Sequence, residues 1–271
     1  MIHVVTLSWN GLDKLQRLRP GLLRNLNNTH HEYQWYIRDN GSLDKTLETI
    51  QDWPEVQALG VSHNRDNFAQ GVNSLADLAF KNAADRDLDS QFLLLLNNDV
   101  EFTEDLAISK MLNLMKDPKV GVVGARLLYQ GTSQLQHAGV IFGERYGRMP
   151  YHYRHKEPND NNSEKNRYFQ AVTAALCLVR MEAFQKIGGM DPKFSWAFED
   201  ISMCLSIGGL GYKVAYCGEA SAFHEESASL KKNPVNKLFM NNNVNYFKTK
   251  WSGKYQLDHE KYLNNPKYNE I

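Results

Sequence analysis

Residues 92–102, FLLLLNNDVEF, constrain the fold of this chain more than any other segment. Four consecutive leucines at 93–96 form a short apolar run without polar alternation, which predicts a strand buried on both faces, as in the centre of a parallel sheet. Asn97, Asn98 and Asp99 follow directly. Because open α/β sheets bind ligands beyond the ends of their strands, Asp99 is a candidate metal or phosphate-site residue. The alternative is a simple turn, since Asn and Asp are common turn residues.

The first hundred residues alternate between strand and helix patterns. Strands are predicted at residues 3–8, 33–38, 56–62 and 93–96, and helices at about 12–26, 42–53 and 68–84. Pro20 and Gly21 are expected to bend or split the first of these helices. Because alternation at this short spacing indicates βαβ units, this part of the chain is predicted to be α/β with a parallel sheet.

The second half of the chain is less regular. Helices are predicted from Thr103 or Glu104 to Lys116, at 181–187, from Glu199 and at 233–251, and strands at 120–128, 135–142 and 212–216. Residues 143–167 are expected to form an irregular functional or mobile loop, and the polar residues 254–271 to be peripheral. The sequence shows no internal repeat and no low-complexity linker, so one domain is favoured.

Composition argues against several classes of protein. Lys and Arg together number 31 and balance 31 Asp and Glu, so the chain lacks the excess positive charge that broad nucleic-acid binding requires. The first residues do not form a signal-peptide pattern, and no apolar run approaches the roughly 20 residues of a membrane span. The three cysteines, Cys177, Cys204 and Cys217, lie far apart within apolar segments. They are predicted to be buried, reduced thiols of a cytoplasmic protein.

Polar clusters follow three predicted strands, at residues 8–10, 39–42 and 97–99. Together they suit a mononucleotide, with Trp9 stacked on the base, Asp39 accepting a hydrogen bond from the base or ribose, and Asp99 holding a divalent cation. The absence of GxGxxG and GxxxxGK[ST] patterns disfavours a dinucleotide site or a P-loop. For Asp39 taken alone, a turn at Asn40-Gly41 is the favoured alternative.

Two later clusters carry titratable groups. Glu199 and Asp200 follow Trp196-Ala197-Phe198 at a predicted helix start. Burial and mutual repulsion raise a carboxylate pKa toward the range of a general base, whereas a helix N-terminus lowers it. Ordinary helix capping is the alternative, and in isolation the commoner one. His224 is a candidate metal ligand, and His137 and His152 are weaker ones, although a single histidine is more often structural.

These segments, in this order, resemble the family-two glycosyltransferases of the inverting GT-A type, in the bacterial branch with rhamnosyltransferase-like members. The matches are S-W-N at 8–10, R-D-N-G-S-L-D-K-T at 38–46, R-D-N-F-A-Q-G-V-N at 65–73, L-L-L-N-N-D at 94–99, Q-H-A-G-V at 136–140, V-T-A-A at 172–175, G-G-M-D-P-K-F at 188–194, E-D at 199–200, G-Y-K-V at 211–214 and H-E-E-S at 224–227. Each match is weak alone, but their number, order and spacing make the resemblance strong.

The resemblance implies an α/β fold of the GT-A, Rossmann-like type. Its central sheet would be mainly parallel and flanked by helices, with a less regular acceptor-side second half. Residues 1–230 would form a single glycosyltransferase domain, in which about 1–100 bind the nucleotide and 101–230 the metal and acceptor. Residues 231–271 would add an amphipathic helix and a polar tail.

The resemblance also implies an activity. A metal-dependent, hexosyltransferase-type enzyme would move a sugar, with inversion, from a nucleotide-sugar donor to a hydroxyl of a glycan, lipid-linked or glycoconjugate acceptor in polysaccharide biosynthesis. UDP- and dTDP-sugars are favoured, because Asp39 would accept from the N3–H of uracil or thymine. The implied site residues are Ser8, Trp9, Asn10, Asp39, Asn67, Asn97 and Asn98 for the nucleotide, Asp99 and His224 for Mg²⁺ or Mn²⁺, Asp200 as general base, and Glu199 as the residue that orients the acceptor or base.

Some positions depart from the family pattern. Ser202 and Ser206 stand where an acid and an arginine are usual, which concerns acceptor-side contacts or helix packing. Asn67 replaces a glycine. Asn97 replaces the first Asp of a D-x-D motif, which leaves one carboxylate in that motif and predicts weaker metal dependence.

Other interpretations stay open. The chain would be a catalytically silent glycan-binding or scaffold protein if the site were inactive. A sugar nucleotidyltransferase would need a glycine-rich basic loop after the first strand, which residues 9–14 do not supply. The enzyme is expected to be cytoplasmic and not to bind nucleic acid. Peripheral membrane contact through the lysine-bearing helix at 233–251 is less favoured than packing of that helix on the domain.

Overall fold

The computed structural model describes residues 1–61, 66–83, 87–153, 161–195, 197–225, 234–265 and 267–271. Several predicted features lie outside the described residues. They are Trp196, the last two residues of the H-E-E-S match, part of the predicted loop, and the predicted element ends at 62, 84 and 233. The strands are β1 (Ile2–Ser8), β2 (Tyr33–Asp39), β3 (Val56–Gly60), β4 (Phe92–Leu96), β5 (Val100–Phe102), β6 (Val120–Tyr129), β7 (Leu135–His137), β8 (Val140–Phe142), β9 (Pro150–His152), β10 (Arg167–Phe169), β11 (Leu176–Arg180) and β12 (Lys213–His224). The helices are α1 (Leu12–Asn27), α2 (Thr46–Gln51), α3 (Phe68–Asn82), α4 (Ala107–Met115), α5 (Met181–Lys186), α6 (Glu199–Gly209), α7 (Pro234–Trp251) and α8 (His259–Asn264), with short 3-10 helices at Leu88–Ser90, Glu144–Tyr146 and Asn161–Glu164.

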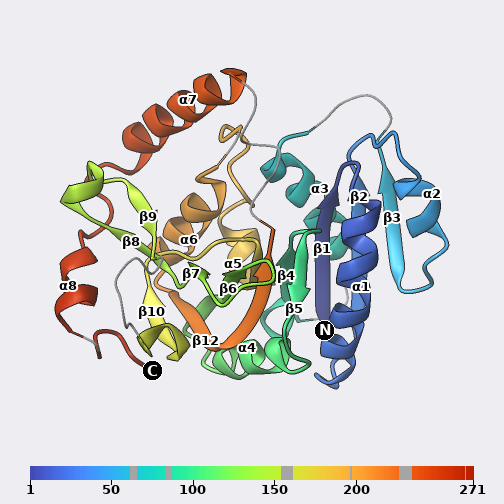
Figure 1. Ribbon diagram of the computed structural model, residues 1–271, viewed down its shortest axis with the longest axis horizontal. Helices are drawn as coiled ribbons and strands as arrows, with labels where there is room; N and C mark the ends of the chain where they lie inside the picture. Colours follow the sequence, from blue (N-terminus) through green and yellow to red (C-terminus); the bar gives the residue numbers. More distant parts are fainter. Residues whose placement is uncertain (62–65, 84–86, 154–160, 196, 226–233, 266) are drawn as a thin grey trace.

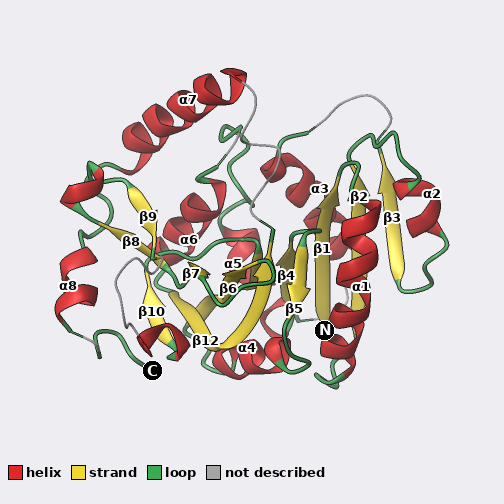
Figure 2. Ribbon diagram, viewed as in Figure 1, coloured by secondary structure: helices red, strands yellow, loops and turns green. Residues whose placement is uncertain are grey.

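One large sheet forms the centre of the molecule, in the order β10-β12-β6-β11-β4-β1-β2-β3 (Figure 2). Strands β4, β1, β2 and β3 run parallel, whereas β11 lies antiparallel between β4 and β6. Strand β12 is parallel to β6, and β8 and β9 form a separate small sheet. The carboxyl ends of β1, β2 and β4 therefore meet at one edge, which confirms the predicted mainly parallel α/β architecture.

Strand β4 is buried on both faces, as its leucine run predicts. No residue at 93–96 exposes more than 2% of its surface. Leu94 and Leu96 belong to a core shared with α1, α2 and α4, and Leu93 and Leu95 to a core shared with α3, α5 and α6. The sheet is thus the middle of three layers (Figure 1).

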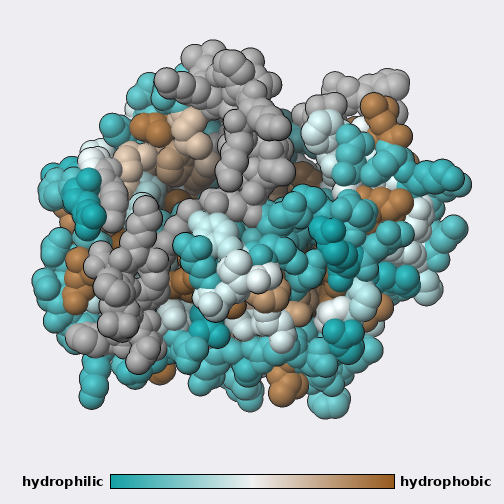
Figure 3. Space-filling model, viewed as in Figure 1, coloured by the Kyte–Doolittle hydropathy of each residue, from teal (hydrophilic) through white to brown (hydrophobic). Residues whose placement is uncertain are grey.

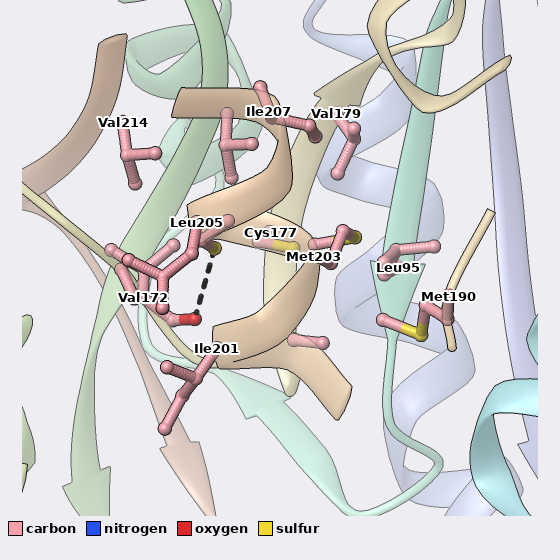
Figure 4. Packing of buried hydrophobic residues seen from close by; sticks show 14 of the residues in the cluster. Leu95, Val172, Cys177, Val179, Met190, Ile201, Met203, Leu205, Ile207 and Val214 are labelled. Atoms are coloured by element: carbon pink, nitrogen blue, oxygen red, sulfur yellow. Dashed lines mark hydrogen bonds between the residues drawn. The ribbon is translucent and has the colours of Figure 1, made fainter. Parts of the chain in front are cut away.

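Helix α6 packs against the sheet over β11 (Figure 4). Its Ile201, Met203 and Ile207 belong to the same buried cluster as Cys177 and Val179 of β11. The Cys204 thiol donates to the Val172 carbonyl oxygen at 3.6 Å. This packing fixes the N-terminus of α6, and with it the Glu199-Asp200 pair, relative to the sheet.

Two elements differ from prediction in their continuity. Helix α1 is not split at Pro20, because buried leucines on both sides of it, Leu18 and Leu22 among them, anchor both halves to the sheet. The predicted strand at 135–142 is instead two strands, β7 and β8. They separate where Gly139 adopts a left-handed φ of +100°, and a Cβ there would lie 2.6 Å from the Phe169 ring.

Two element boundaries also differ from prediction. Helix α4 begins at Ala107, since Thr103 and Glu104 hydrogen-bond to Ser221 of β12 instead of capping a helix. Strand β12 continues to His224 because its second half pairs with β6 and β5.

The C-terminal segment is packed on the domain and not peripheral as expected. Tyr262 is 2% exposed, stacks on Phe169 with ring centroids 4.5 Å apart and donates to the Tyr168 carbonyl oxygen at 2.6 Å. In Figure 1, α7 and α8 lie with β8–β10 on the side of the molecule opposite α1 and α2. Phe247 of α7 is fully buried, as expected for a helix whose apolar side packs on the domain.

On the face shown in Figure 3, the described residues are predominantly hydrophilic, with hydrophobic residues in small separate groups. Within the described ranges, none of the helices combines the length and the apolar character that a membrane span requires. The three cysteines are buried and unpaired, as predicted.

Candidate functional site

The three polar clusters that follow β1, β2 and β4 lie together at one edge of the sheet. Ser8 pairs in register with Asp39, and the Asn40 amide donates to the Ser8 carbonyl oxygen at 2.7 Å. The Asn98 side-chain amide donates to Ser8 Oγ at 3.0 Å, and the Asn10 backbone amide to Ser42 Oγ at 2.8 Å. The sequence prediction that these clusters form one site is consistent with this geometry.

A strand-end cavity of about 420 Å³ opens at this edge. Its lining residues are Leu7, Ser8, Trp9, Asn10, Lys14, Asn40, Phe68, Asn97, Asn98 and Asp99. Trp9 keeps 41% of its surface exposed, which is unusual for tryptophan. Six of the residues predicted for nucleotide or metal binding therefore line one cavity.

Asp39 and Asn67 occupy different positions from these six. Both carboxylate oxygens of Asp39 accept hydrogen bonds from Ser42, one from its backbone amide at 3.1 Å and one from its hydroxyl, in a turn where Gly41 has a φ of +79°. The turn interpretation thus has direct support. Asn67 caps α3 by accepting from the Gln70 amide at 2.9 Å, and it lines a neighbouring cavity.

Asp99 and His224 meet at the end of β4, as expected for metal ligands. Pairing of β12 with β5 brings His224 opposite Val100, and its Nε2 lies 3.2 Å from Asp99 Oδ1. His224 Nδ1 lies 2.7 Å from Gln136 Oε1, so it carries the proton that Gln136 accepts. The Nε2 lone pair then faces the carboxylate oxygen, an arrangement that fits a divalent cation with an oriented histidine ligand.

The protein supplies few ligands of its own for such an ion. No group of three or more His, Cys, Asp or Glu side chains suited to metal binding occurs in the described part of the chain. Lys14 Nζ lies 3.6 Å from Asp99 Oδ2 and 3.7 Å from Glu225 Oε2. Burial acts to raise the pKa of Asp99, whereas a hydrogen bond from Nε2 of a protonated His224 and the charge of Lys14 lower that pKa. With the neutral His224 that would bind a cation, the charge of Lys14 still favours the ionised form of Asp99.

A second cavity of about 470 Å³, the carboxylate cavity, adjoins the first and shares Phe68 and Asn97 with it. Glu199 and Asp200 line it at the start of α6. The preceding Ala197 and Phe198 both have left-handed backbone conformations, with φ of 80° and 73°. For residues other than glycine each costs about 1–3 kcal/mol, and such strain is concentrated at functional sites.

Asp200 is held by several hydrogen-bond donors. Its Oδ1 accepts from the Ile201 amide at 2.8 Å, its Oδ2 from the Ala174 amide at 3.2 Å, and the Thr173 side chain also donates to it. Burial nevertheless raises the pKa of Asp200. These donors favour the ionised form and fix the orientation of the carboxylate.

Glu199 has a different environment from its neighbour. Burial and the charge of Asp200 raise the pKa of Glu199 to about 8. Its Oε2 is buried and has no hydrogen-bond partner among the residues that the structure describes. At neutral pH, Glu199 therefore carries the proton of the pair, and it presents an unsatisfied polar atom at a cavity that a polar ligand would complete.

Three residues that contact the predicted site residues were not identified from the sequence. Gln136 orients His224, Thr173 holds Asp200, and Lys14 approaches Asp99. Gln136 and Thr173 belong to the Q-H-A-G-V and V-T-A-A matches. The family resemblance therefore included both residues, but it gave neither of them a role. His137 and His152, the weaker metal candidates, contact each other, with Nδ1 atoms 2.9 Å apart.

A third and larger cavity, about 730 Å³ in volume, shares no lining residue with these two. Tyr168, Trp251 and Tyr255 are among its lining residues. None of the predicted site residues belongs to it.

Comparison with known proteins identifies the family. A model described as Glycosyl transferase family 2 matches residues 4–188. The O-antigen biosynthesis protein RfbC of Myxococcus xanthus is 25% identical over 228 residues, which cover 82% of this chain and 17% of RfbC. The N-acetylglucosaminyl-diphospho-decaprenol L-rhamnosyltransferase of Mycobacterium tuberculosis is 23% identical over 226 residues, covering 78% of this chain and 72% of that enzyme. The chain thus spans a small part of RfbC, and likewise 26% of a Sinorhizobium fredii relative.

Solved structures show the same architecture. GalNAc-T7, crystallised with UDP, GalNAc and Mn²⁺, superposes with a TM-score of 0.67 at 15% identity, over 94% of this chain and 48% of that one. At this identity the similarity concerns the fold, which is the GT-A fold implied by the resemblance. Because the family model covers well over half of the sequence, the chain belongs to glycosyl transferase family 2.

Proposed function

We propose that the chain is an inverting glycosyltransferase that moves a sugar from a nucleotide-sugar to a hydroxyl of a glycan or glycoconjugate. One observation carries the proposal: two adjoining cavities share Phe68 and Asn97, one lined by the strand-end polar residues and the other by the buried Glu199-Asp200 pair. A donor in the first cavity would direct its sugar toward the second. This arrangement, within a glycosyl transferase family 2 fold, suits transfer better than silent glycan binding.

The strand-end cavity would hold the nucleotide. Trp9, which lines it, would stack on the base, and Ser8, Asn10 and Asn98 would form hydrogen bonds with the nucleotide. Asp39 would accept from the N3–H of uracil or thymine through a lone pair that Ser42 leaves available, since a carboxylate has about four acceptor positions. UDP- and dTDP-sugars are accordingly the favoured donors, and UDP in the GalNAc-T7 structure agrees with this choice.

Asp99 and His224 would hold Mg²⁺ or Mn²⁺, with Asn97 beside them and Gln136 orienting the imidazole. When bound, the ion would offset the negative charge that develops on the departing diphosphate. The Mn²⁺ in the GalNAc-T7 structure supports a divalent cation in this fold. Donor phosphates and water would complete its coordination, because the described residues offer no group of three ligating side chains there.

Asp200 would act as the general base. It accepts the proton of the acceptor hydroxyl as that oxygen attacks C1 of the sugar, on the face opposite the diphosphate. The bond from C1 to the phosphate oxygen breaks, and the nucleoside diphosphate leaves. A base of this kind contributes roughly 10²–10⁴ in rate. Glu199, protonated at neutral pH, would orient the acceptor or Asp200 through its hydrogen bonds.

The acceptor is proposed to be a cell-surface glycan or its lipid-linked precursor. The names of RfbC and of the mycobacterial rhamnosyltransferase, which acts on N-acetylglucosaminyl-diphospho-decaprenol, support this class. The cytoplasmic location and a membrane contact through 233–251 stay predictions. Burial of Phe247 against the domain favours packing over membrane contact for that part of the helix.

Calorimetric titration with UDP, dTDP and GDP, with and without Mn²⁺, tests the donor site. One nucleotide is expected to bind in a Mn²⁺-dependent manner to the wild-type chain, and Asp99→Ala is expected to weaken it at least tenfold, since a ligand to the cation is lost. Asp105→Ala is the matched control, because this exposed carboxylate pairs with Arg24 away from the cavity. Failure of every nucleotide to bind in the presence of Mn²⁺ would favour the scaffold alternative.

A further inference from the structure

Lys14 brings a positive charge to the carboxylate that is proposed to hold the cation. It lies in the first turn of α1, and the buried Leu15 and Leu18 anchor that helix to the sheet. Its Nζ lies 3.6 Å from Asp99 Oδ2. Lys14 is also the only lysine or arginine among the described residues that line the strand-end cavity. The proposed function gives this ammonium group no role.

The neighbouring charges make Asp99 the main partner of Lys14. Glu225 Oε2 is 3.7 Å from Lys14 Nζ, but the same oxygen lies closer to Arg17 Nη2, at 3.2 Å. Arg17 also pairs with Glu101, with its Nε 2.9 Å from Oε1. Of the two carboxylates near Lys14, that of Asp99 is the more buried. The Lys14 ammonium group therefore neutralises Asp99 in this arrangement.

The two carboxylate oxygens of Asp99 have different neighbours. Oδ1 lies 3.2 Å from His224 Nε2, whereas Oδ2 faces Lys14. A divalent cation held by Asp99 and His224 would thus share one carboxylate with an ammonium group, and like charges this close repel each other. Asn97 adds no negative charge to offset them. An anion that contacts both positive groups removes the conflict, and the diphosphate of a nucleotide-sugar is such an anion.

We propose that Lys14 is a phosphate-binding residue of the donor site and makes the binding of cation and donor interdependent. Its ammonium group opposes the cation when the cavity holds no nucleotide, and it donates to the diphosphate when the nucleotide is bound. Because Lys14 supplies a positive charge of its own, the nucleotide also binds, more weakly, without a divalent cation. The inference rests on the proposed function and names the residue of α1 that contacts the donor phosphates.

Lys14→Met tests both roles, since it keeps the length of the side chain and removes its charge. Electron paramagnetic resonance of Mn²⁺ without nucleotide should show at least about threefold tighter binding to the variant, because the opposing charge is gone. Calorimetry in EDTA should show UDP binding at least about tenfold weaker than in the wild type, the typical effect of one charge-assisted hydrogen bond. Binding of uridine, measured by ligand-observed NMR, should not change. A substitution that merely damages the fold would weaken all three.

Two further variants are the controls. Lys14→Arg keeps a positive charge and should bind UDP in EDTA nearly as the wild type does. Lys81→Met removes the charge of an exposed lysine near the end of α3, the helix that begins at the cavity-lining Phe68. It should match the wild type in all three measurements. If the titration selects dTDP, then dTDP and thymidine replace UDP and uridine.

The inference and the proposed function fail in different ways. Lys14→Met binding UDP in EDTA as well as the wild type, or binding Mn²⁺ no more tightly, would overturn the inference alone. A wild-type chain that binds UDP only in the presence of Mn²⁺ would do the same. A wild-type chain that binds none of the nucleotides even with Mn²⁺ would overturn the proposed function, and the inference with it.

Discussion

At the residue scale, Asp200 is the group on which the proposed transfer depends most. Asp200→Asn keeps the size of the side chain but removes the ability to take a proton. It is expected to lower kcat at least about a hundredfold and to leave nucleotide binding unchanged. Transfer assays and calorimetry check the two halves of this prediction, with Asp105→Asn on the surface as the control. Unchanged turnover would remove Asp200 from the role of base.

Glu199 makes a prediction about stability. Its pKa is raised by burial and by Asp200 from 4.5 in the unfolded chain to about 8 in the folded protein. Between these values the folded state binds more protons than the unfolded state, so the free energy of unfolding falls as pH rises from about 4.5 to 8. Glu199→Gln removes this contribution. Urea unfolding at pH 5 and pH 8 should show a smaller decline for the variant than for the wild type.

A matched glutamate serves as the control for that measurement. Glu144→Gln changes a side chain that is 69% exposed and should decline with pH as the wild type does. Equal declines for Glu199→Gln and the wild type would mean that Glu199 does not carry the proton of the pair. Asp200 shifts in the same direction, so part of the decline should persist in Glu199→Gln.

At the element scale, close packing against β6 connects the fold to the site. A Cβ on Gly124 would lie 2.6 Å from Cβ of the buried, branched Val172, which has little freedom to move. Gly124→Ala should therefore lower the free energy of unfolding by about 1–3 kcal/mol. Because Thr173 and Ala174 follow Val172 directly and hold Asp200, transfer should fall as well. Chemical denaturation and transfer assays measure both effects.

Gly208→Ala is the control for Gly124→Ala. Gly208 lies in α6, and a Cβ there meets no atom within 4 Å. Since alanine is the better helix former, this variant should be as stable as the wild type or more so. A stable and fully active Gly124→Ala would show that residues 172–174 can move to accommodate the added methyl group without displacing Asp200.

Element boundaries show where local patterns succeed. The leucine run at 93–96 and the helical spacing in α1 were predicted correctly, because burial on one or both faces leaves a periodic trace in the sequence. Gly139 and the late start of α4 were not predicted, since both depend on contacts with Phe169 and Ser221 from distant strands.

At the scale of the whole molecule, the C-terminal segment stabilises the second half of the domain. Tyr262 buries its ring on Phe169 and bonds the Tyr168 carbonyl oxygen. Tyr262→Ala should lower the free energy of unfolding by about 3–5 kcal/mol, as for other large aromatic truncations in a core. Leu43→Ala, at a side chain that is 91% exposed, should change it by less than about 0.5 kcal/mol. A loss below 1 kcal/mol for Tyr262→Ala would return residues 254–271 to the peripheral role first expected.

The sequence by itself determined the α/β architecture, the family resemblance and the polar clusters that line the strand-end cavity. Each of these depends on short-range features: apolar periodicity, turn residues and motifs within a few positions. Asp99, for example, lies three residues after the end of a buried strand, so its place at the sheet edge is expected from this segment alone.

Only the tertiary structure decided the partners that tune the site. His224 and Gln136 are 88 residues apart in sequence, and the Asp200 carboxylate receives its donors from residues 173 and 174. The contact of His137 with His152 depends on how β7 and β9 are brought together. These partners are set by the register of strands that are distant in sequence, and a hydrogen bond of about 3 Å requires a placement that residue spacing alone does not specify.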